Sequence, residues 1–460
     1  SASHFDDDTA YASVSRFRVH DLHPYIYRTH DGGKNWQLIN AGLPDNAPAD
    51  TVREDPAEKN LVFAGTENGV SVSFDAGDHW QTLQLNLPHT SARDLWIHDD
   101  DLIVATHGRS FWILDDISPL RQLTKSASDA SPFLYQPEVA FRVRRDTNTD
   151  TPIPPDEPSA ENPPDGAILD YYLAKPPSSP VVLEIMMGQN QLIRRYSSAD
   201  QPEISQDALA KQLIPLYWIR PFKSLPNGAG MHRWVWDLHL PPPTVTKHEY
   251  PISAVPGDTQ RSPMGPLALP GKYTVRLTVE GQTYSAPLEV KMDPRVKATP
   301  EALQHQFAQQ MHLSEMLSRS SEAVMQAHSV QSQLQKLSLQ KQKGAPSKEL
   351  DAVIHSITNL LEKAADGNAA EPRRALETLN NDIGTLYGLL GAADAPPTKA
   401  ILQAIAAADT DLAADMKQWE QFKSAELPEL NRKLRAAKLS EIQLDSSLLP
   451  DNGGMDINED

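Results

Sequence analysis

Residues 29–36, THDGGKNW, recur at residues 73–80 as SFDAGDHW, and both stretches fit the pattern S/T-x-D-x-G-x-x-W. The two aspartates lie 44 residues apart, and a Leu-Pro pair follows each tryptophan at the same distance. A second register, at a spacing of 40, pairs the RE of residues 53–54 with the RD of residues 93–94. Short β-like runs and Gly/Asp turns that repeat every 40 to 45 residues or so are typical of β-propeller blades.

The chemistry of a tight turn explains the repeated pattern. An aspartate side chain accepts hydrogen bonds from backbone N–H groups just ahead of it, and glycine tolerates a positive φ. The tryptophan is expected to pack back between neighbouring sheets. The residues of the two turns are therefore predicted to be structural and not catalytic: Thr29, Asp31, Gly33, Trp36, Ser73, Asp75, Gly77 and Trp80.

The two turns resemble the Asp box, or bacterial neuraminidase repeat. Residues 25–33, 52–67 and 105–116 are similar to large exported bacterial proteins with a sortilin-type, glycosyl hydrolase-like β-propeller, and the likeness continues at residues 232–238 and 270–277. The resemblance covers most of the chain. It implies the C-terminal portion of a secreted multidomain protein that has a large N-terminal propeller.

Residues 1–122 contain only two to three repeats of this kind, whereas a closed propeller needs about four to eight blades. A stub of a propeller leaves a bare sheet edge and an uncovered apolar face. We therefore expect partial propeller blades here. The missing blades are expected on a second polypeptide or on a removed N-terminal part of the same precursor.

The residue composition of the rest of the chain changes twice. Alternating apolar segments predict an immunoglobulin-like β-sandwich over residues 123–298, with a Pro/Asp-rich insertion near 146–166 that looks disordered. From Thr299 onward glycine is rare and apolar residues recur at helical spacing, which predicts an antiparallel four-helix bundle over residues 299–445. Residues 446–460 form an acidic tail. The predicted fold class is multidomain, mainly β and then all-α.

Composition excludes several classes of function. The formal net charge is −19 and there are no cysteines. The charge argues against nucleic-acid binding, which needs a basic surface, and the cysteine count excludes disulfides and thiolate sites. No apolar run is long enough to span a membrane. No cofactor or metal site is predicted, because nucleotide-binding and metal-ligand spacings are missing.

The best candidates for ligand binding lie on the expected blade ends. Two charged pairs, Arg53 with Glu54 and Arg93 with Asp94, recur at matching positions. An arginine cluster beside acids is the chemistry of sialidases, whereas charges repeated from blade to blade are typical of ion pairs between blades. Both interpretations stay open.

His107 and Arg109 depart from the repeat, since Glu67 and Gly69 stand at the matching positions. A departure inside a repeat marks either a binding site or a closing blade with a different turn. No residue is assigned a catalytic role.

We therefore expect a non-catalytic binding or assembly module of an exported protein, in the periplasm or outside the cell, that joins a larger assembly or a glycan. The alternative is a glycoside hydrolase or carbohydrate-binding propeller whose site is completed by blades on another chain. Paired inward carboxylates in a wide cleft distinguish the two.

Overall fold

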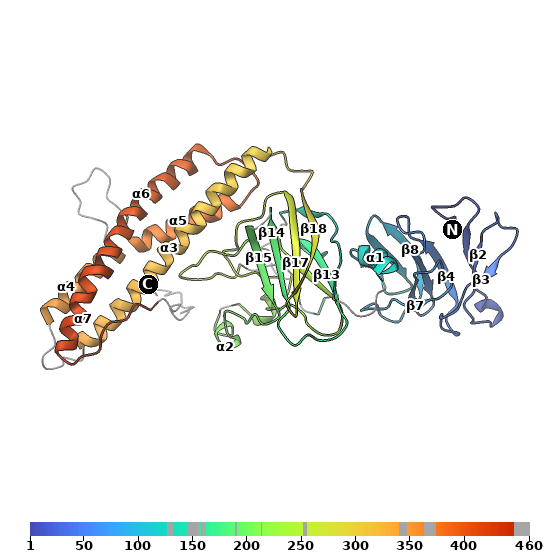
Figure 1. Cartoon of the computed structure of the whole chain (residues 1–460), viewed down its shortest axis with the longest axis horizontal. Coiled ribbons are helices and arrows are strands. Elements are labelled where there is room, and N and C mark those ends of the chain that lie inside the picture. The colour runs from blue at the N-terminus through green and yellow to red at the C-terminus, as the bar shows by residue number, and fades with distance from the viewer. Residues whose placement is uncertain are drawn as a thin grey trace.

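The computed structural model describes residues 1–126, 132–144, 154, 156–157, 160, 162–188, 191–212, 214–251, 255–339, 347–362 and 374–445. Three regions follow one another along the long axis of the molecule (Figure 1). Antiparallel sheets at the N-terminus form the repeat region, a two-sheet region lies in the middle, and a helical region follows. The chain is thus mainly β and then helical, as predicted.

The repeat region holds three small antiparallel sheets, formed by strands consecutive in the chain. Sheet 1 consists of β1 (Ala10–Ser13), β2 (Ile26–Thr29) and β3 (Gln37–Leu38); sheet 2 of β4 (Ala49–Glu54), β5 (Val62–Thr66), β6 (Gly69–Ser73) and β7 (Gln81–Thr82); sheet 3 of β8 (Ala92–His98), β9 (Asp101–Thr106) and β10 (Phe111–Leu114). A 3-10 helix spans Phe17–Val19.

Strand registers show that the three sheets repeat one design. Val62 pairs with Ser73 in sheet 2, as Leu102 pairs with Leu114 in sheet 3. The first strands of these sheets, β4 and β8, share an irregularity directly after Ala49 and Ala92. β4, β5 and β6 therefore correspond to β8, β9 and β10. In the same way β5, β6 and β7 correspond to β1, β2 and β3.

Each pair of neighbouring sheets encloses a small apolar core. Between sheets 1 and 2 the core is built around Tyr11, Ile26, Val62 and Trp80. Between sheets 2 and 3 it consists of Leu61, Phe63, Val70, Val72, Ala92, Leu95, Leu102, Val104 and Ile117. Sheet 2 is thus buried on both faces, because its strands are apolar at successive positions.

Helix α1 (Ser118–Ser126) follows sheet 3, and the two-sheet region begins at residue 132. A curled five-stranded sheet has the order β12-β18-β17-β14-β15, and a three-stranded sheet has the order β11-β13-β16. The strands are β11 (Phe133–Leu134), β12 (Ala140–Arg142), β13 (Ala167–Leu173), β14 (Val182–Met187), β15 (Gln191–Ser197), β16 (Gly230–Trp236), β17 (Gly271–Val279) and β18 (Gln282–Met292). β12 pairs with β18 in parallel, and both sheets contribute to one core that includes Leu169, Trp236 and Val275.

The sequence correctly predicts the hairpin of β17 and β18. Val279 pairs with Gln282, so the turn consists of Glu280 and Gly281, which have φ values of 48° and 81°. Two positive φ values in a two-residue loop match the twist of a hairpin. Two short helices, α2 (Gln206–Leu209) and a 3-10 helix at Leu216–Trp218, lie between β15 and β16.

The helical region begins at Pro300, where Thr299 caps α3 by accepting a hydrogen bond from the Ala302 N–H, as predicted from the Thr-Pro pair. Its elements are α3 (Pro300–Leu339), α4 (Ser347–Glu362), α5 (Leu376–Gly391), α6 (Lys399–Gln421), a π-helix (Phe422–Glu426) and α7 (Leu427–Ala436). They share one apolar core. No helix among the described residues is long and apolar enough to cross a membrane.

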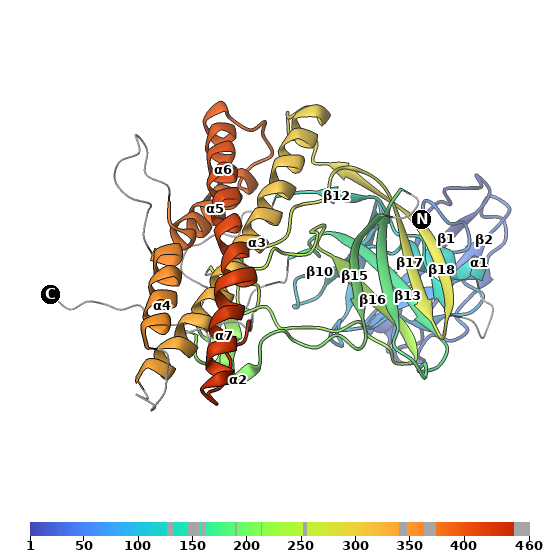
Figure 2. The same cartoon turned by 60° about the vertical axis from the view of Figure 1, so that its left-hand side comes forward.

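Polar contacts join the helices to the two-sheet region on the side away from the repeat sheets (Figures 1 and 2). Arg142 donates to the Ala268 carbonyl and pairs with Asp394, which lies after α5. Tyr387 donates to the Met264 carbonyl at 2.6 Å. The acidic tail 446–460 and most of the 146–166 insertion lie outside the described residues.

Candidate functional site

The two Asp-box turns have the same hydrogen bonds, atom for atom. In the first, Thr29 Oγ1 donates to Asp31 Oδ1 and accepts from the Gly33 N–H, and Asp31 Oδ1 accepts from the Asn35 N–H. In the second, Ser73, Asp75, Gly77 and His79 take the same four roles. The glycines have positive φ values of 85° and 100°. At Asp75 burial is the largest single effect and raises the pKa, but the hydrogen-bond donors together outweigh it. Backbone and side-chain donors therefore hold the pKa of both aspartates below its ordinary value.

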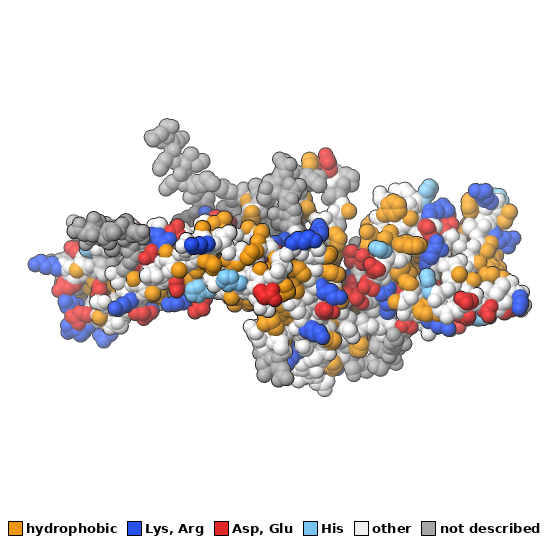
Figure 3. Space-filling view, turned by 90° about the horizontal axis from the view of Figure 1, so that it is seen from above, with side chains coloured by type: hydrophobic (Ala, Val, Ile, Leu, Met, Phe, Trp, Pro, Cys, Tyr) orange, Lys and Arg blue, Asp and Glu red, His pale blue; other side chains and the backbone are white. Residues whose placement is uncertain are grey.

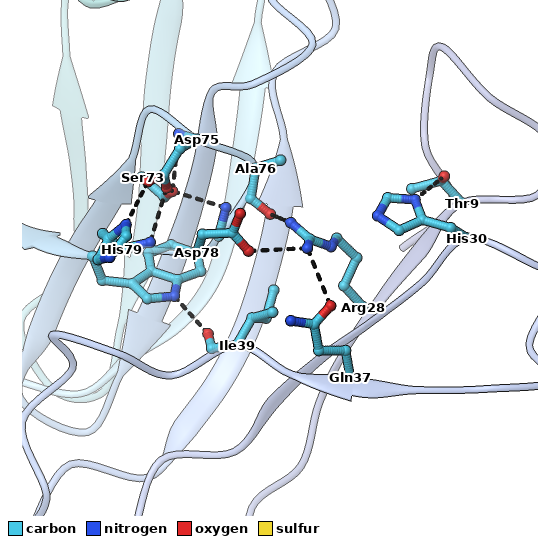
Figure 4. A network of polar contacts seen from close by, with 12 residues as sticks. Thr9, Arg28, His30, Gln37, Ile39, Ser73, Asp75, Ala76, Asp78 and His79 are labelled. Atoms are coloured by element: carbon cyan, nitrogen blue, oxygen red, sulfur yellow. Dashed lines mark hydrogen bonds and ion pairs between the residues drawn. The ribbon is translucent and has the colours of Figure 1, made fainter.

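The tryptophans of the two boxes differ in their surroundings. Trp80 is 4% exposed, packs against sheet 1 and donates its indole N–H to the Ile39 carbonyl at 2.7 Å (Figure 4). Trp36 is 45% exposed, and its indole N–H donates only to Gly33 in its own turn. The expected packing between sheets thus holds for Trp80 and is wrong for Trp36. The reason is that sheet 1 has no preceding sheet among the described residues.

Sheets 1 and 2 are also joined by a buried arginine. Arg28 donates to the Ala76 carbonyl and pairs with Asp78 at 2.9 Å, so that it reaches from β2 to the second Asp box (Figure 4). The second Asp box therefore provides contacts to the sheet before it.

Three of the six charged residues predicted as ligand-binding candidates form ion pairs between sheets 2 and 3. Arg53 on β4 pairs with Asp94 on β8 at 2.6 Å and also donates to the Leu95 carbonyl. Arg93 on β8 pairs with Asp50 and Glu67 of sheet 2 at 3.3 and 3.0 Å. The charges of Arg53 and Arg93 are therefore both used in ion pairs between sheets.

The other three candidates lie apart from these ion pairs. Glu54 is buried and accepts a hydrogen bond from the His4 N–H at 2.7 Å. It also lies beside Tyr11, whose pKa is raised to about 12 by burial and then by this carboxylate. His107 and Arg109 are exposed on the β9–β10 turn. The six predicted residues therefore do not form one cluster.

The outward face of sheet 3 is apolar and uncovered. We define the sheet-3 face as Trp96, Ile103, Ala105, Phe111 and Ile113, which lie side by side on β8, β9 and β10. Phe111 and Ile113 are 75% and 56% exposed. Their counterparts in sheet 2, Val70 and Val72, are 2% and 3% exposed because sheet 3 covers them.

An apolar groove lies beside this face, along the free edge of β10. We define the edge groove by Leu83, Leu85, Leu87, Trp112 and Ile113, with Val70, Gln84, Asn86, Leu102, Val104 and Leu114 completing the lining. Its walls come from the segment after β7 and from β10. The groove therefore lies where sheets 2 and 3 meet at their outer edge.

An acidic hollow of about 280 Å³ lies between sheet 3 and the two-sheet region. Acidic side chains gather at this junction (Figure 3). The hollow is lined by Asp99, Asp100, Asp101, Asp115, Asp116, Glu138, Val139, Ala140, Phe141, Pro163, Pro164, Gly166 and Ile168. Burial raises the pKa of Glu138, as do the neighbouring carboxylates of Asp100 and Asp116. Among the residues that the structure describes, no group of three or more acids and histidines could hold a metal ion.

Arg121 of α1 neutralises part of this junction. It pairs with Asp55 of the β4–β5 turn and with Asp100 of the β8–β9 turn. Arg233 on β16 likewise pairs with buried Asp170 and donates to the carbonyls of Asp115 and Asp116. These contacts fix α1 and the two-sheet region against one end of the sheets.

Sequence reasoning expected a bare sheet edge and an uncovered apolar face but did not name the residues of the sheet-3 face, and it missed the acidic hollow. The signal for the face was the run Phe111–Leu114, FWIL, which is apolar at four successive positions. Such a run is typical of a strand covered on both faces. The hollow depends on residues 99–101 and 138 meeting in space, which no local pattern predicts.

No known protein family matches this chain, and no curated protein matches it. Among solved structures, the chain is similar to an ancestral GH74 enzyme, at 11% sequence identity and a TM-score of 0.18. The similarity covers 63% of this chain and 34% of the enzyme's chain, so the chain spans about a third of that length. A likeness of this size carries no argument about activity.

Proposed function

We propose that this chain is a non-catalytic binding and assembly module of an exported β-propeller protein. Its three repeat sheets serve as propeller blades, and further sheets of the same kind pack on the sheet-3 face. Those sheets belong to another polypeptide or to another part of the same protein.

The observation that carries the proposal is the equivalence of the sheet-3 face to a buried face. Ile103 corresponds to Phe63, and Phe111 and Ile113 correspond to Val70 and Val72, by strand register. In sheet 2 these positions are covered by the next sheet. A contiguous exposed apolar face on a sheet marks an interaction surface. Because the equivalent face of sheet 2 is covered by a repeat sheet, we expect another repeat sheet to cover this one.

The other regions fit a scaffold. The strand order β12-β18-β17-β14-β15 facing β11-β13-β16 supports the immunoglobulin-like interpretation of the two-sheet region. The shared core of α3 to α7 supports the interpretation as a helical bundle. The predicted arginines Arg53 and Arg93 are used in ion pairs.

Site-specific cross-linking in the native protein tests the proposal. The photoreactive residue p-benzoylphenylalanine is introduced at Phe111, and cross-linked peptides are identified by mass spectrometry from the natural host. We expect position 111 to join a strand of another Asp-box sheet, because that face is apolar and open. Phe222, also exposed but in the two-sheet region, is the matched control.

A cross-link within one polypeptide or between two supports the proposal, provided that the joined peptide belongs to an S/T-x-D-x-G-x-x-W repeat. Position 111 joining only peptides without this repeat, or giving no more product than position 222, overturns it.

The alternative, a glycoside hydrolase, is favoured by one observation, the proximity of Glu138 to Asp100 in the acidic hollow. A carboxyl group whose pKa is raised by burial and by a second carboxyl is typical of a general acid. A hydrolysis screen with the native protein and its Glu138→Gln variant tests this alternative. Turnover lost in the variant would favour it over the assembly module.

A further inference from the structure

We infer that the edge groove receives a β-strand that adds to β10 and inserts the indole of a tryptophan beside Leu83 and Leu87. This inference rests on the proposed function and names the chemistry of the partner segment. The equivalent groove between sheets 1 and 2 is filled by a tryptophan of this chain, Trp80.

In that interface the groove is formed by Ile39 and Leu43, in the segment after β3. Trp80 fills it: its indole N–H donates to the Ile39 carbonyl at 2.7 Å, and its backbone N–H donates to the Ala41 carbonyl at 2.8 Å. Both apolar residues are thereby buried, with exposed fractions of 3% and 7%. The tryptophan directly precedes β7, the outermost strand of sheet 2.

The edge groove repeats this arrangement without the tryptophan. Leu83 and Leu87 follow β7 exactly as Ile39 and Leu43 follow β3, 44 positions earlier, and each set ends in a Leu-Pro pair. Yet Leu83 and Leu87 are only half-buried, and Leu85 between them is 71% exposed. Trp112 of β10 lines the groove from the other side, yet Leu83 and Leu87 stay half-buried beside it.

The edge of β10 beside this groove is free for pairing. In sheet 2, β7 pairs with β6 through Ser71 opposite Thr82 and Val72 opposite Gln81. The counterparts of Ser71 and Val72 in β10 are Trp112 and Ile113, and no strand pairs with them on the outer side among the described residues. An unpaired edge beside an apolar groove suits strand addition, in which backbone hydrogen bonds and a side-chain pocket act together.

The described residues after β10 leave this edge open. After β10, Asp116 donates its N–H to Asp101 and the chain enters α1, which Arg121 fixes to Asp55 and Asp100 at the strand ends. Helix α1 thus takes the place of an Asp box and outer strand without covering the groove. We expect the added strand from outside the described residues, with a tryptophan just before a short polar strand, as in residues 80–82.

A synthetic peptide of residues 73–83, SFDAGDHWQTL, is the probe. It is titrated against the full chain up to about 1 mM, the range of a weak peptide contact, with fluorescence anisotropy as the readout. We expect saturable binding that slows amide hydrogen exchange at Trp112 and Ile113. A peptide with the W80A change should bind at least tenfold more weakly.

Chain variants locate the binding. Leu85 has a φ of 43°, a conformation in which aspartate is tolerated, so Leu85→Asp should fold while placing a charge in the groove and weakening the peptide at least tenfold. Leu389→Asp, an exposed leucine on α5, should leave binding unchanged. Equal binding of the two peptides, binding without protection of β10, or no saturable binding overturns the inference.

The two proposals fail separately. Cross-linking through Phe111 reports on the sheet-3 face, whereas the peptide reports on the edge of β10. A negative peptide result together with an Asp-box cross-link rejects strand addition and leaves the assembly module in place. A positive peptide result without such a cross-link rejects the assembly module as we describe it.

Discussion

The interface between sheets 1 and 2 and the outer side of sheet 3 are built from one repeat but differ in what covers them. In the first, Trp80 is buried against Ile39. In the second, Phe111 and Ile113 lie in solvent although their counterparts in sheet 2 are buried. Whether a side chain of a repeat sheet is buried therefore depends on the sheet that packs on it and not on the sheet that carries it. A sheet can keep its fold while one of its faces stays available.

The largest expected contrast is between the two box tryptophans. Trp80→Ala removes a buried indole and its hydrogen bond, and should lower the local stability of sheets 1 and 2 by about 3–5 kcal/mol. Trp36→Ala, at the exposed box, should lower it by less than about 1 kcal/mol. Hydrogen exchange of the β4 to β6 amides measures both. Equal losses would contradict the difference between the two faces.

Shortening the side chain at equivalent strand positions should give the second-largest effect on stability. Val72→Ala in the core between sheets 2 and 3 should cost about 2 kcal/mol, whereas Ile113→Ala at the corresponding exposed position should cost less than about 0.5 kcal/mol. The same exchange measurement on β6 and β10 compares them. In the native assembly the cost of Ile113→Ala should rise toward that of Val72→Ala, and no rise would count against coverage by another sheet.

The ion pair between sheets 2 and 3 should contribute little. Asp94 is 62% exposed in its pair with Arg53, so solvent screens the attraction. A double-mutant cycle of Arg53→Ala and Asp94→Ala should give a coupling of about 0.2–1 kcal/mol that shrinks in high salt. The helical pair Arg432–Glu429 serves as a surface control. A coupling several times larger would indicate that this pair is a main element of the interface.

The smallest effect concerns pH. The Asn35 N–H donor, then the Asn35 side chain and Thr29, lower the pKa of Asp31 in the folded state. Stabilisation from this group is therefore complete above its unfolded pKa of about 4 and is lost as the pH falls through the lower folded value. Asp31→Asn should remove this loss of stability at acidic pH, as measured by thermal unfolding from pH 6 down into the acidic range. An unchanged pH profile would contradict the role of the carboxylate.

The parts predictable from sequence are those fixed by local hydrogen bonds. The Asp boxes need partners only two to four residues away, as in Asp31 with Thr29 and Asn35, and the β17–β18 hairpin needs one two-residue turn. The prediction that the RE of residues 53–54 and the RD of residues 93–94 stand at matching positions was wrong. By strand register Arg53 matches Trp96 and Asp94 matches Thr51, although Arg53 and Asp94 do form an ion pair between sheets. The exposure of Trp36 was not predictable, because it depends on whether a sheet precedes sheet 1. Glu54, treated as a partner of Arg53 because the two are adjacent in sequence, lies on the opposite side of β4 and accepts a hydrogen bond from the His4 N–H.

Helix α1 leads the chain away from the ends of the strands in sheet 3, held there by Arg121 on two turns of sheets 2 and 3. The downstream regions are therefore anchored to the last two repeat sheets, through Asp55 of sheet 2 and Asp100 of sheet 3. Whole repeats could be gained or lost upstream during evolution without disturbing that anchor. The part of the chain from α1 onward is thus suited to repeat arrays of different length.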